Sequence, residues 1–299
     1  IQGTIGYFHH QGCCQLPSDL KRVTEVLIDL GLSANVGAAL IVSLGCEGTD
    51  HQRVYETIKA SGKPCEIIHI QELGGTSAGI QAGMDAAQRL VMQISGQQRE
   101  TCDISNLTMA IKCGGSDTTS GMASNCVIGY VADKLVDLGA TVVFGETTEF
   151  LGGEHILASR AVGGPDGPVA KKIYEIVERM ENRAKAIGED MRGGQPTPGN
   201  IAGGLSSIEE KSLGAIVKSG HRPIQGVLEY TDRITDQKGL WIKDTPGREP
   251  EILTGMAATG AQVLMFSTGR GAPQGFCSMP VIKICGNPIT YARMSHDMD

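Results

Sequence analysis

The chain has 299 residues, 40% hydrophobic and 20% charged, which is typical of an ordinary globular chain with one large or two smaller domains. Its net charge of −7 provides no basic stripe to neutralise phosphates, which argues against a nucleic-acid partner. No apolar run reaches the roughly 18 residues that a membrane-spanning helix needs, and no signal-peptide pattern opens the sequence. We therefore expect a cytoplasmic protein without a membrane partner.

The first third of the chain alternates short apolar runs with helical patterns. The predicted strands are residues 4–8, 36–44 and 65–70, and the predicted helices are residues 20–30, 50–59 and 77–93, with Asp19 as the first helix cap. This order of elements is typical of a parallel sheet with right-handed crossovers. The sequence therefore predicts a Rossmann-like α/β domain over residues 1–100.

A polar linker at residues 95–106 precedes a second α/β domain, predicted over residues 107–299. Its predicted strands are residues 107–113, 141–145, 261–266 and 279–284. Its predicted helices are residues 122–138, a long surface helix at 169–191, and a short one opened by a capping box from Ser206 to Glu209. Because the chain begins without Met and ends at Asp299 without a tail, we expect a fold truncated at both ends.

The segment Lys112-Cys-Gly-Gly-Ser-Asp117 is the most informative part of the sequence. It follows an apolar run, and its glycines let the backbone approach a ligand or adopt positive φ. Ser116, Asp117 and Ser120 are helix-capping types, which predicts a helix N-terminus with free N–H groups. Two interpretations remain open: a site for an anionic small molecule beside a reactive or metal-binding group, and a tight turn with a buried thiol.

Three cysteines share one context, since Cys13, Cys46 and Cys113 each follow or end a predicted strand beside a glycine. The nine cysteines form no CxxC pair, and their odd number fits reduced thiols better than a disulfide framework. If the strand ends converge, these thiols with His9 or His10 would make a soft-metal or iron–sulfur site. The alternative is three unrelated turns.

A loop after the strand at residues 141–145 gathers acidic and imidazole side chains: Glu146, Glu149, Glu154 and His155. Such groups can bind a divalent cation or act as acid and base, and the alternative is a solvated acidic loop. Arg270, between two glycines, can clamp a substrate carboxylate or make a surface salt bridge. Lys112, near the end of an apolar strand, is either a snorkelling side chain or a site cation.

Taken together, these segments resemble the altronate/galactarate dehydratase family of sugar-acid lyases. The matching motifs run along nearly the whole chain: His9-x-x-Gly-Cys13, Leu44-Gly-Cys-Glu47, Ile70-Gln-Glu-x-Gly-Gly-Thr76, Lys112-Cys-Gly-Gly-Ser-Asp117 with Ser120 and Asn125, Glu146-Thr-x-Glu149, Pro198-Gly-Asn200, Ile208-Glu-Glu-Lys-Ser-Leu-Gly214 and Thr268-Gly-Arg-Gly271. The resemblance implies β-elimination of water from a polyhydroxy acid to leave a 2-keto-3-deoxy acid. It also implies a divalent metal, most often Fe²⁺, with Mn²⁺ or an iron–sulfur centre as alternatives.

On this resemblance we assign roles to the residues that match. The metal is expected near Cys13, Cys46, Cys113 and His9. The acid/base groups are expected among Glu146, Glu149, Glu154, His155 and Lys112. The side chains expected to hold the substrate are Ser116, Asp117, Ser120, Asn125 and Arg270.

Two departures from the family keep alternatives open. The small N-terminal β-rich domain of long members and their usual opening motif are missing, so we expect a separate small subunit or a separate domain to supply them. Two-subunit relatives include the sulfolactate sulfo-lyases, which release sulfite and are the second functional hypothesis. The third is a domain that only binds a metal or a sugar acid. A homo-oligomer acting on a small anionic substrate is the expected assembly.

Overall fold

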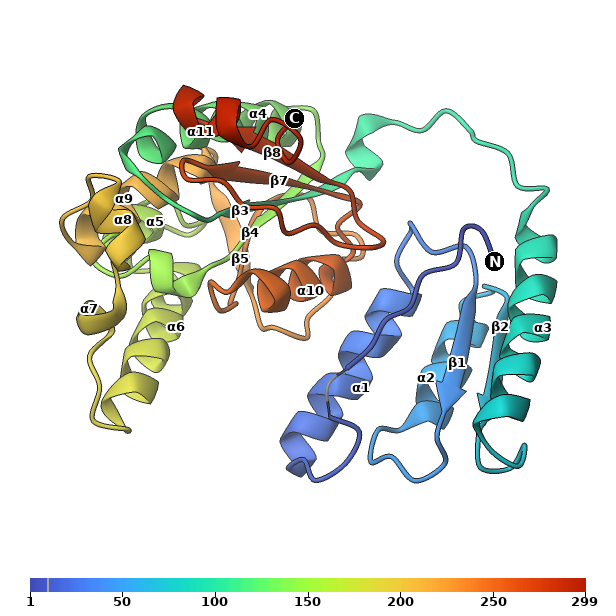
Figure 1. The fold of residues 1–299 in the computed structure, drawn as a ribbon. Coiled ribbons are helices and arrows are strands. Elements are labelled where there is room, and N and C mark those ends of the chain that lie inside the picture. Colours follow the sequence, from blue (N-terminus) through green and yellow to red (C-terminus); the bar gives the residue numbers. More distant parts are fainter. Residues whose placement is uncertain (10) are drawn as a thin grey trace. The chain divides into compact units, whose positions relative to one another are not determined.

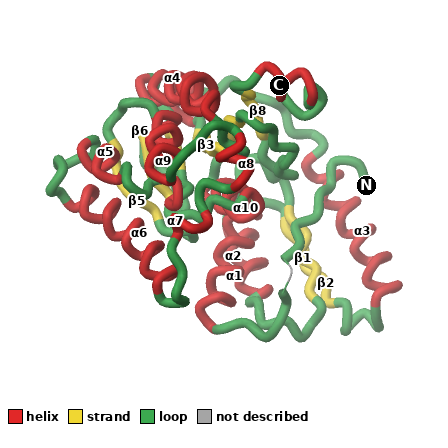
Figure 2. The backbone as a smooth tube through the Cα atoms, turned by 60° about the vertical axis from the view of Figure 1, so that its left-hand side comes forward, coloured by secondary structure: helices red, strands yellow, loops and turns green. Residues whose placement is uncertain are grey.

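The structure is a computed structural model that describes residues 1–9 and 11–299, and the chain divides into two compact units (Figure 1). The first comprises residues 1–101 with 257–260, and the second comprises residues 102–256 and 261–299. Helices accompany parallel strands in both, which confirms the predicted α/β class. Figure 2 shows the connection from α3 (Thr76–Ile94) to β3 (Thr108–Cys113) as a long loop with a single 3₁₀ turn, η1 (Ile104–Asn106).

The first unit contains a parallel pair of strands, β1 (Ala39–Ser43) and β2 (Cys65–His69), with Ala39 opposite Cys65. Two helices, α1 (Pro17–Gly31) and α2 (His51–Ala60), pack together and bury an apolar cluster made by Ile28, Val54 and Ile58. Asp50 caps α2 by accepting a hydrogen bond from the Arg53 N–H, at 3.0 Å. The third helix, α3, contacts both strands.

Two predictions for this unit are wrong. Residues 4–8 form no strand, so the sheet of the described residues in this unit has two strands rather than three. Ile5 and Phe8 are 50% and 94% exposed, so the segment buries no apolar face that would hold it on a sheet edge. Asp19 is not the cap of α1, because the helix begins at Pro17, whose fixed φ suits the first helical position.

The second unit is built on a six-stranded, fully parallel sheet with the order β5-β6-β4-β3-β7-β8. Its strands are β3, β4 (Thr141–Phe144), β5 (Ile224–Leu228), β6 (Gly239–Lys243), β7 (Val263–Thr268) and β8 (Val281–Cys285). β3 lies near the centre and pairs with β4 on one side and β7 on the other. The residues that follow β3, β4 and β7 therefore meet at one edge of the sheet, where open α/β sheets bind ligands.

Helices cover both faces of this sheet. The helices of this unit are α4 (Asn125–Asp137), preceded by a π-helical turn η2 (Ser120–Ser124), α5 (Glu154–Ser159), α6 (Pro168–Lys185), α7 (Met191–Gly194), α8 (Pro198–Ala202), α9 (Ile208–Ile216), α10 (Glu249–Thr259) and α11 (Pro288–Arg293). The 3₁₀ turns η3 (Thr147–Glu149) and η4 (Val217–Ser219) complete the unit. Figure 1 shows α4 and α10 on opposite sides of the strands. The main core joins Met109 and Ile111 of β3 to Ile128 of α4 and Ile173 of α6.

Several element boundaries in this unit differ from prediction. β5, β6 and α10 were not predicted; Gly226 inside β5 and Gly239 at the start of β6 weaken the strand pattern there. The long helix ends at Lys185 rather than at residue 191, and Gly188 follows with a φ of 79°. The cap of α9 is Ser207, which accepts from the Glu210 N–H, rather than Ser206.

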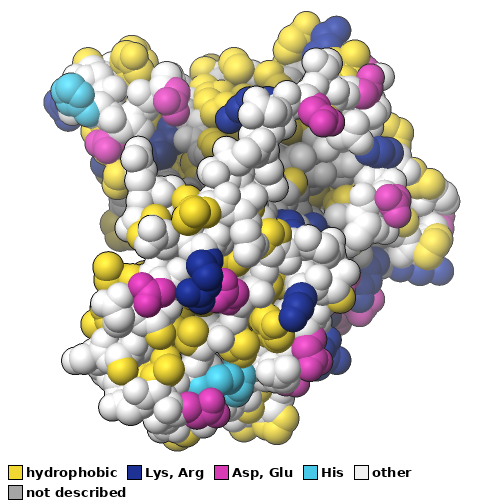
Figure 3. Space-filling model, turned by 90° about the vertical axis from the view of Figure 1, so that its right-hand side faces the viewer, with side chains coloured by type: hydrophobic (Ala, Val, Ile, Leu, Met, Phe, Trp, Pro, Cys, Tyr) yellow, Lys and Arg dark blue, Asp and Glu magenta, His cyan; other side chains and the backbone are white. Residues whose placement is uncertain are grey.

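Among the described residues, no helix combines the length and the apolar character that crossing a bilayer requires. On the face shown in Figure 3, acidic and basic side chains are interspersed with apolar ones.

Candidate functional site

The site begins with Lys112 and Cys113, the last two residues of β3. Successive side chains of a strand point to opposite faces of its sheet. Cys113 therefore lies on the side of Ile111 and the main core, while the Lys112 ammonium lies 4.5 Å from the centre of the Phe266 ring. Both side chains are buried, at 0% and 1% exposed, so their polar atoms must find partners within the protein.

Glu146 supplies those partners from the end of β4. Its carboxylate Oε1 lies 3.1 Å from the Lys112 Nζ, and its Oε2 lies 2.6 Å from the Lys218 Nζ. The same Oε2 accepts the Cys113 N–H at 2.9 Å, and Lys218 also donates to the Cys113 Sγ at 3.1 Å. We call Lys112, Cys113, Glu146 and Lys218 the buried ion cluster. The Glu146 carboxylate thus binds two ammonium groups, those of Lys112 and Lys218, which lie on opposite faces of the sheet.

The cluster fixes the charges of its members. Burial by itself would raise the pKa of Glu146, but Lys112 and Lys218 hold that pKa below its usual value, so the carboxylate is ionised. Burial would lower the pKa of Lys218, but the charge of the Glu146 carboxylate and its hydrogen bond raise it, so the ammonium stays charged. Burial, together with the Glu146 charge, raises the pKa of the Cys113 thiol to about 12. Cys113 is therefore a neutral thiol near neutral pH.

Glu146 has the left-handed backbone conformation, with φ 70° and ψ 60°. Such a conformation in a residue other than glycine costs of order 1 kcal/mol and persists only where the surroundings enforce it. Here the enforcement comes from the carboxylate contacts and from the Glu146 N–H, which donates to the Thr245 Oγ1 at 2.8 Å. The 3₁₀ turn η3 starts directly after this residue, and the Glu149 N–H donates to the Glu146 carbonyl at 2.7 Å.

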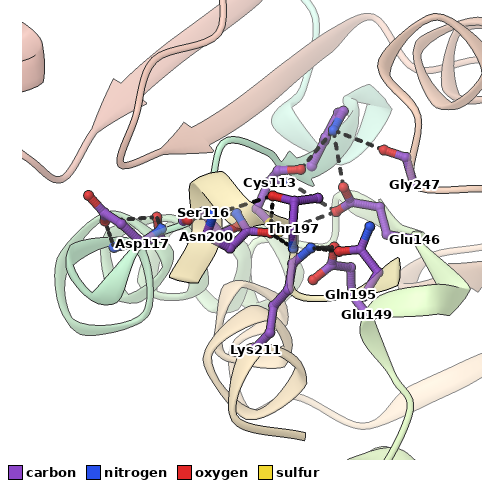
Figure 4. A network of polar contacts seen from close by, with 12 residues as sticks. Cys113, Ser116, Asp117, Glu146, Glu149, Gln195, Thr197, Asn200, Lys211 and Gly247 are labelled. Atoms are coloured by element: carbon purple, nitrogen blue, oxygen red, sulfur yellow. Dashed lines mark hydrogen bonds and ion pairs between the residues drawn. The ribbon is translucent and has the colours of Figure 1, made fainter. Parts of the chain in front are cut away.

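Glu149 forms a second acid–base pair, with Lys211 of α9 (Figure 4). The Lys211 Nζ lies 3.1 Å from the Glu149 Oε1 and also donates to the Gln195 Oε1. The second carboxylate oxygen, Oε2, has no hydrogen-bond partner among the described residues. Burial is the main cause that raises the pKa of Glu149, and the nearby Glu146 charge adds to it although Lys211 opposes it. This carboxyl group therefore keeps its proton to a higher pH than an exposed glutamate does.

Lys211 also borders a hollow of about 280 Å³ that lies against the turn between β3 and α4. Besides Lys211 and the apolar Leu205 and Leu213, the hollow is lined by Ser116, Asp117, Ser120 and Asn125, all of which are buried side chains. A larger hollow of about 540 Å³ follows α6, but Arg179, which lines it, is tied to Glu229 and Asp244 in a surface ion network. The chemistry-bearing groups therefore converge on the smaller hollow.

The Asp117 carboxylate is used to hold the turn after β3, because both of its oxygens accept hydrogen bonds from the protein. Its Oδ1 accepts from the Ser120 N–H at 3.1 Å while its own N–H donates to the Ser120 Oγ, which is a reciprocal cap of the helix start. Its Oδ2 accepts from the Asn287 amide at 3.0 Å. Gly269 passes so close that a side chain there would overlap the Asp117 carboxylate, which explains the glycine before Arg270.

The segments around this turn are tied together by amide side chains. Asn200 of α8 donates to the Ser116 carbonyl at 2.8 Å, and Asn125 donates to the Gly214 carbonyl at 2.8 Å (Figure 4 shows the Asn200 contact). Four of the five side chains predicted to hold substrate thus line one hollow. The fifth, Arg270, is exposed, and its backbone N–H donates to the Gly115 carbonyl at 2.8 Å.

Glu154 and His155 are not joined to this network among the described residues. They begin α5, which packs against α6, and His155 is exposed. The predicted acidic loop therefore divides: Glu146 and Glu149 are buried beside Lys112, Lys211 and Lys218, whereas Glu154 and His155 belong to a separate helix.

The remaining predicted ligands, Cys13, Cys46 and His9, lie in the first unit. A hydrogen bond of 2.8 Å from the Gly48 N–H to the Gly12 carbonyl joins their two loops. Both thiols are exposed, and the Cys13 Sγ lies 3.8 Å from the Cys14 Sγ. Hydrogen bonding and charge repulsion from Cys14, with a smaller repulsion from Cys46, raise the pKa of Cys13, so the thiols interact. His10 lies outside the described residues.

These residues meet the needs of a transition metal only in part. Thiol and imidazole groups on neighbouring loops are suitable donors for iron. No three His, Cys, Asp or Glu side chains are gathered closely enough to hold a metal ion within the described parts of the chain. A metal at Cys13 and Cys46 therefore takes further ligands from elsewhere. Cys113 does not fit a metal, because its sulfur accepts from one ammonium and two ammonium groups share its cluster.

Two lysines of the site were not predicted as site residues. Lys211 occurs in the Ile208–Gly214 motif, and Lys218 follows the apolar run Ala215-Ile-Val217. A lysine directly after buried apolar residues is the signal that could have identified Lys218, as it did Lys112.

Comparison with known proteins identifies both parts of the chain. Residues 104–299 match the C-terminal domain model of D-galactarate/altronate dehydratase, and residues 1–95 match the second domain model of D-galactarate dehydratase/altronate hydrolase.

Similar curated proteins carry two kinds of name. Over 300 residues the chain is 39% identical to the (2R)-sulfolactate sulfo-lyase subunit beta of Chromohalobacter salexigens, covering 100% of the chain and 76% of that protein. It is 31% identical over 295 residues to the altronate dehydratase of Bacillus subtilis, covering 97% of the chain and 57% of that protein. It is 36% identical over 263 residues to the galactarate dehydratase (L-threo-forming) of Escherichia coli, covering 86% of the chain and 49% of that protein. The chain thus spans only about half the length of these two dehydratases, and all three names are those of lyases.

Proposed function

The chain belongs to the D-galactarate/altronate dehydratase family of lyases, and from this premise we propose that it catalyses β-elimination of water from a sugar acid to give a 2-keto-3-deoxy acid. The substrate class is a polyhydroxy acid of the altronate or galactarate type. The observation that carries the proposal is the Glu149–Lys211 pair, in which a buried, half-partnered carboxyl group contacts the lysine that lines a polar hollow.

The elimination needs a group that removes the proton next to the substrate carboxylate and a group that protonates the departing hydroxyl. In our proposal Glu149 does both. As a carboxylate it accepts the carbon-bound proton, the electrons form the carbon–carbon double bond, and the same proton passes to the hydroxyl, which leaves as water. The enol product then tautomerises to the keto acid. A carboxyl group whose pKa is raised suits this work, because both of its forms are accessible.

The other residues bind and orient the substrate in this scheme. The Lys211 ammonium attracts the substrate carboxylate and the negative charge that builds on it during proton removal. Ser116, Ser120 and Asn125 provide hydroxyl and amide groups for the substrate hydroxyls. We also assign to Arg270, whose backbone N–H donates to the Gly115 carbonyl, contact with the far end of the substrate.

We also propose a metal requirement, with Fe²⁺ as the first candidate and Mn²⁺ or an iron–sulfur centre as alternatives. A bound metal supplies Lewis-acid polarisation of the substrate carboxylate or hydroxyl. Cys13, Cys46 and His9 are the residues that would hold it, because they combine suitable donors on neighbouring loops. Cys113 is left out of this set for the reason given above.

The second candidate is release of sulfite from (2R)-sulfolactate, as the large subunit of a two-subunit enzyme. It is favoured by one observation, the 39% identity to a sulfo-lyase subunit beta that the chain covers to 76%. The chemistry of proton removal would be the same, and only the leaving group differs. The partner in either case is a small subunit or a β-rich domain. A non-catalytic domain that binds a metal or a sugar acid is the third alternative; a homo-oligomer and a cytoplasmic location remain predictions.

Turnover of a substrate panel tests the proposal. The chain is purified anaerobically, its metal content is counted, and it is incubated with altronate, galactarate and sulfolactate. Keto-acid formation without sulfite supports the dehydratase, and sulfite release supports the sulfo-lyase. Binding without turnover by the iron-loaded protein, with its partner domain supplied, would favour a binding module. Lys211→Met is expected to raise KM for the turned-over acid. Lys172→Met, which removes surface ion pairs with Glu175 and Glu229, is expected to leave KM unchanged.

A further inference from the structure

The α9–η4 segment carries two lysines that face the two glutamates of the η3 turn. Lys211 and Lys218 are seven residues apart, which is about two helical turns and places them on one side of the segment. Glu146 and Glu149 are three residues apart, at the start and end of the η3 turn. The result is two parallel ion pairs, with Lys218–Glu146 at 2.6 Å and Lys211–Glu149 at 3.1 Å.

The two pairs differ in their surroundings. The Lys218–Glu146 pair is 0% and 1% exposed, and Lys112 and Cys113 close it off. Its carboxylate therefore cannot meet a substrate. In the other pair Lys211 lines the hollow and Glu149 lies 3.1 Å from its ammonium, and one Glu149 oxygen has no partner among the described residues. The first pair is placed to hold structure and the second to react.

We propose that Lys218 is a positioning residue: by fixing the Glu146 carboxylate it holds the left-handed start of the η3 turn and so places Glu149 against Lys211, the lysine that lines the hollow. The proposal rests on the proposed function and deepens it by separating the roles of the two glutamates. The chain of contacts is short, because Glu146 begins the turn that ends at Glu149 and the Glu149 N–H donates to the Glu146 carbonyl.

The backbone of Lys218 is itself rigidly held, as a positioning role requires. The neighbouring Ser219 donates to the Ile216 carbonyl at 2.7 Å and accepts from the half-buried Arg160 guanidinium at 2.9 Å. Gly129 of α4 lies directly against the Val217 carbonyl, with no room for a side chain between them. The Lys218 ammonium therefore contacts Glu146 from a backbone that is held in one position.

The test compares Lys218→Met with Lys243→Met. Lys243 is also 0% exposed and lies on the same sheet, but its ammonium donates to the Asp232 carbonyl, outside the cluster. Both variants remove a buried ammonium, so a general loss of stability affects both. The measurements are kcat and KM on the acid that the wild-type chain turns over, and hydrogen–deuterium exchange of the amides in residues 146–150.

For Lys218→Met we expect kcat to fall by about 100-fold with KM within about threefold of wild type, because binding groups are kept while the reacting carboxyl is misplaced. Exchange at residues 146–150 should rise by about tenfold, since the turn loses its anchor. Lys243→Met should show neither effect. Lys218→Arg, which keeps the charge, should recover a large part of the lost kcat, and it carries the test if Lys218→Met does not fold.

Unchanged exchange in Lys218→Met would overturn the proposal, as would an equal loss of kcat in Lys243→Met. The exchange measurement needs no substrate, so it judges the positioning role even if the wild-type chain turns over none of the acids in the panel. Conversely, a Glu149→Gln variant that keeps full kcat while exchange still responds to Lys218 would refute the proposed function and leave the anchoring of the turn intact.

Discussion

Replacing Glu146 by glutamine removes one negative charge from the centre of the buried ion cluster and changes little in shape. In the wild-type chain the carboxylate lies 3.1 Å from the Lys112 Nζ and 2.6 Å from the Lys218 Nζ, and all three side chains are at most 1% exposed. Removing one partner of a buried ion pair costs about 3–5 kcal/mol, because the other charge is left without compensation. Glu249, 3.7 Å from Lys112, relieves only part of this loss.

The magnitude is measured against an exposed pair in the same unit. Asp137 and Arg222 make a contact of 2.6 Å, but their side chains are 44% and 39% exposed, so Asp137→Asn should cost at most about 1 kcal/mol. Urea unfolding followed by tryptophan fluorescence reports the second unit, because the single tryptophan, Trp241, lies in β6. With a slope of about 2–3 kcal/mol per molar urea, the Glu146→Gln midpoint should fall by about 1–2.5 M.

A Glu146→Gln midpoint that falls no further than that of Asp137→Asn would mean that the two lysines are neutralised by other groups or reached by water, and that Glu146 is not the anion on which the cluster depends. A large fall with unchanged slope is the result that the geometry predicts.

Three further predictions follow from the site. Burial raises the pKa of Glu149, so the folded state favours the protonated carboxyl group. The stability that this group contributes is complete below its unfolded-state pKa of 4.5 and is lost as the pH rises through its folded-state pKa. Glu149→Gln should therefore gain stability relative to wild type when unfolding is measured from pH 4 to pH 8. Cys113→Ser should keep the wild-type metal content by elemental analysis while Cys13→Ser loses it, and metal loss in Cys113→Ser alone would return Cys113 to the ligand set. Gly269→Ala should lower stability by about 1–3 kcal/mol in urea unfolding, since its methyl group overlaps the Asp117 carboxylate; a stability within error of wild type would show that the turn can yield.

Local patterns predicted much of the fold because they were strong where the chain is buried. Continuous apolar runs identified β3, β4 and β7, and the capping types at Asp117 and Ser120 identified the start of the helix after β3. The strand predicted at residues 4–8 is wrong because an apolar run gives only the tendency to form a strand. Whether a neighbouring element buries that run depends on the tertiary structure. β5 and β6 were missed because their glycines weaken the local signal, although Gly226 lies directly against the Trp241 ring.

The site was predicted in part for the same reason. The adjacency of Lys112 and Cys113 shows at once that two polar side chains sit at a strand end, on opposite faces. That one carboxylate serves both, and that Lys218 comes from 105 residues beyond Cys113 to join them, depends on how α9 packs against the turn. Sequence alone could not separate Glu146 and Glu149 from Glu154 and His155, because the four share one loop and differ only in the direction that the chain takes after η3.

The central claim is that Glu149 carries the proton in the elimination, and kcat of Glu149→Gln on the acid that the wild-type chain turns over tests it most directly. Loss of an acid–base group lowers the rate by roughly 100-fold to 10,000-fold, so we expect a fall of that size, with KM near the wild-type value because the glutamine keeps its place beside Lys211. A variant that retains kcat within a few-fold of wild type would show that another residue transfers the proton.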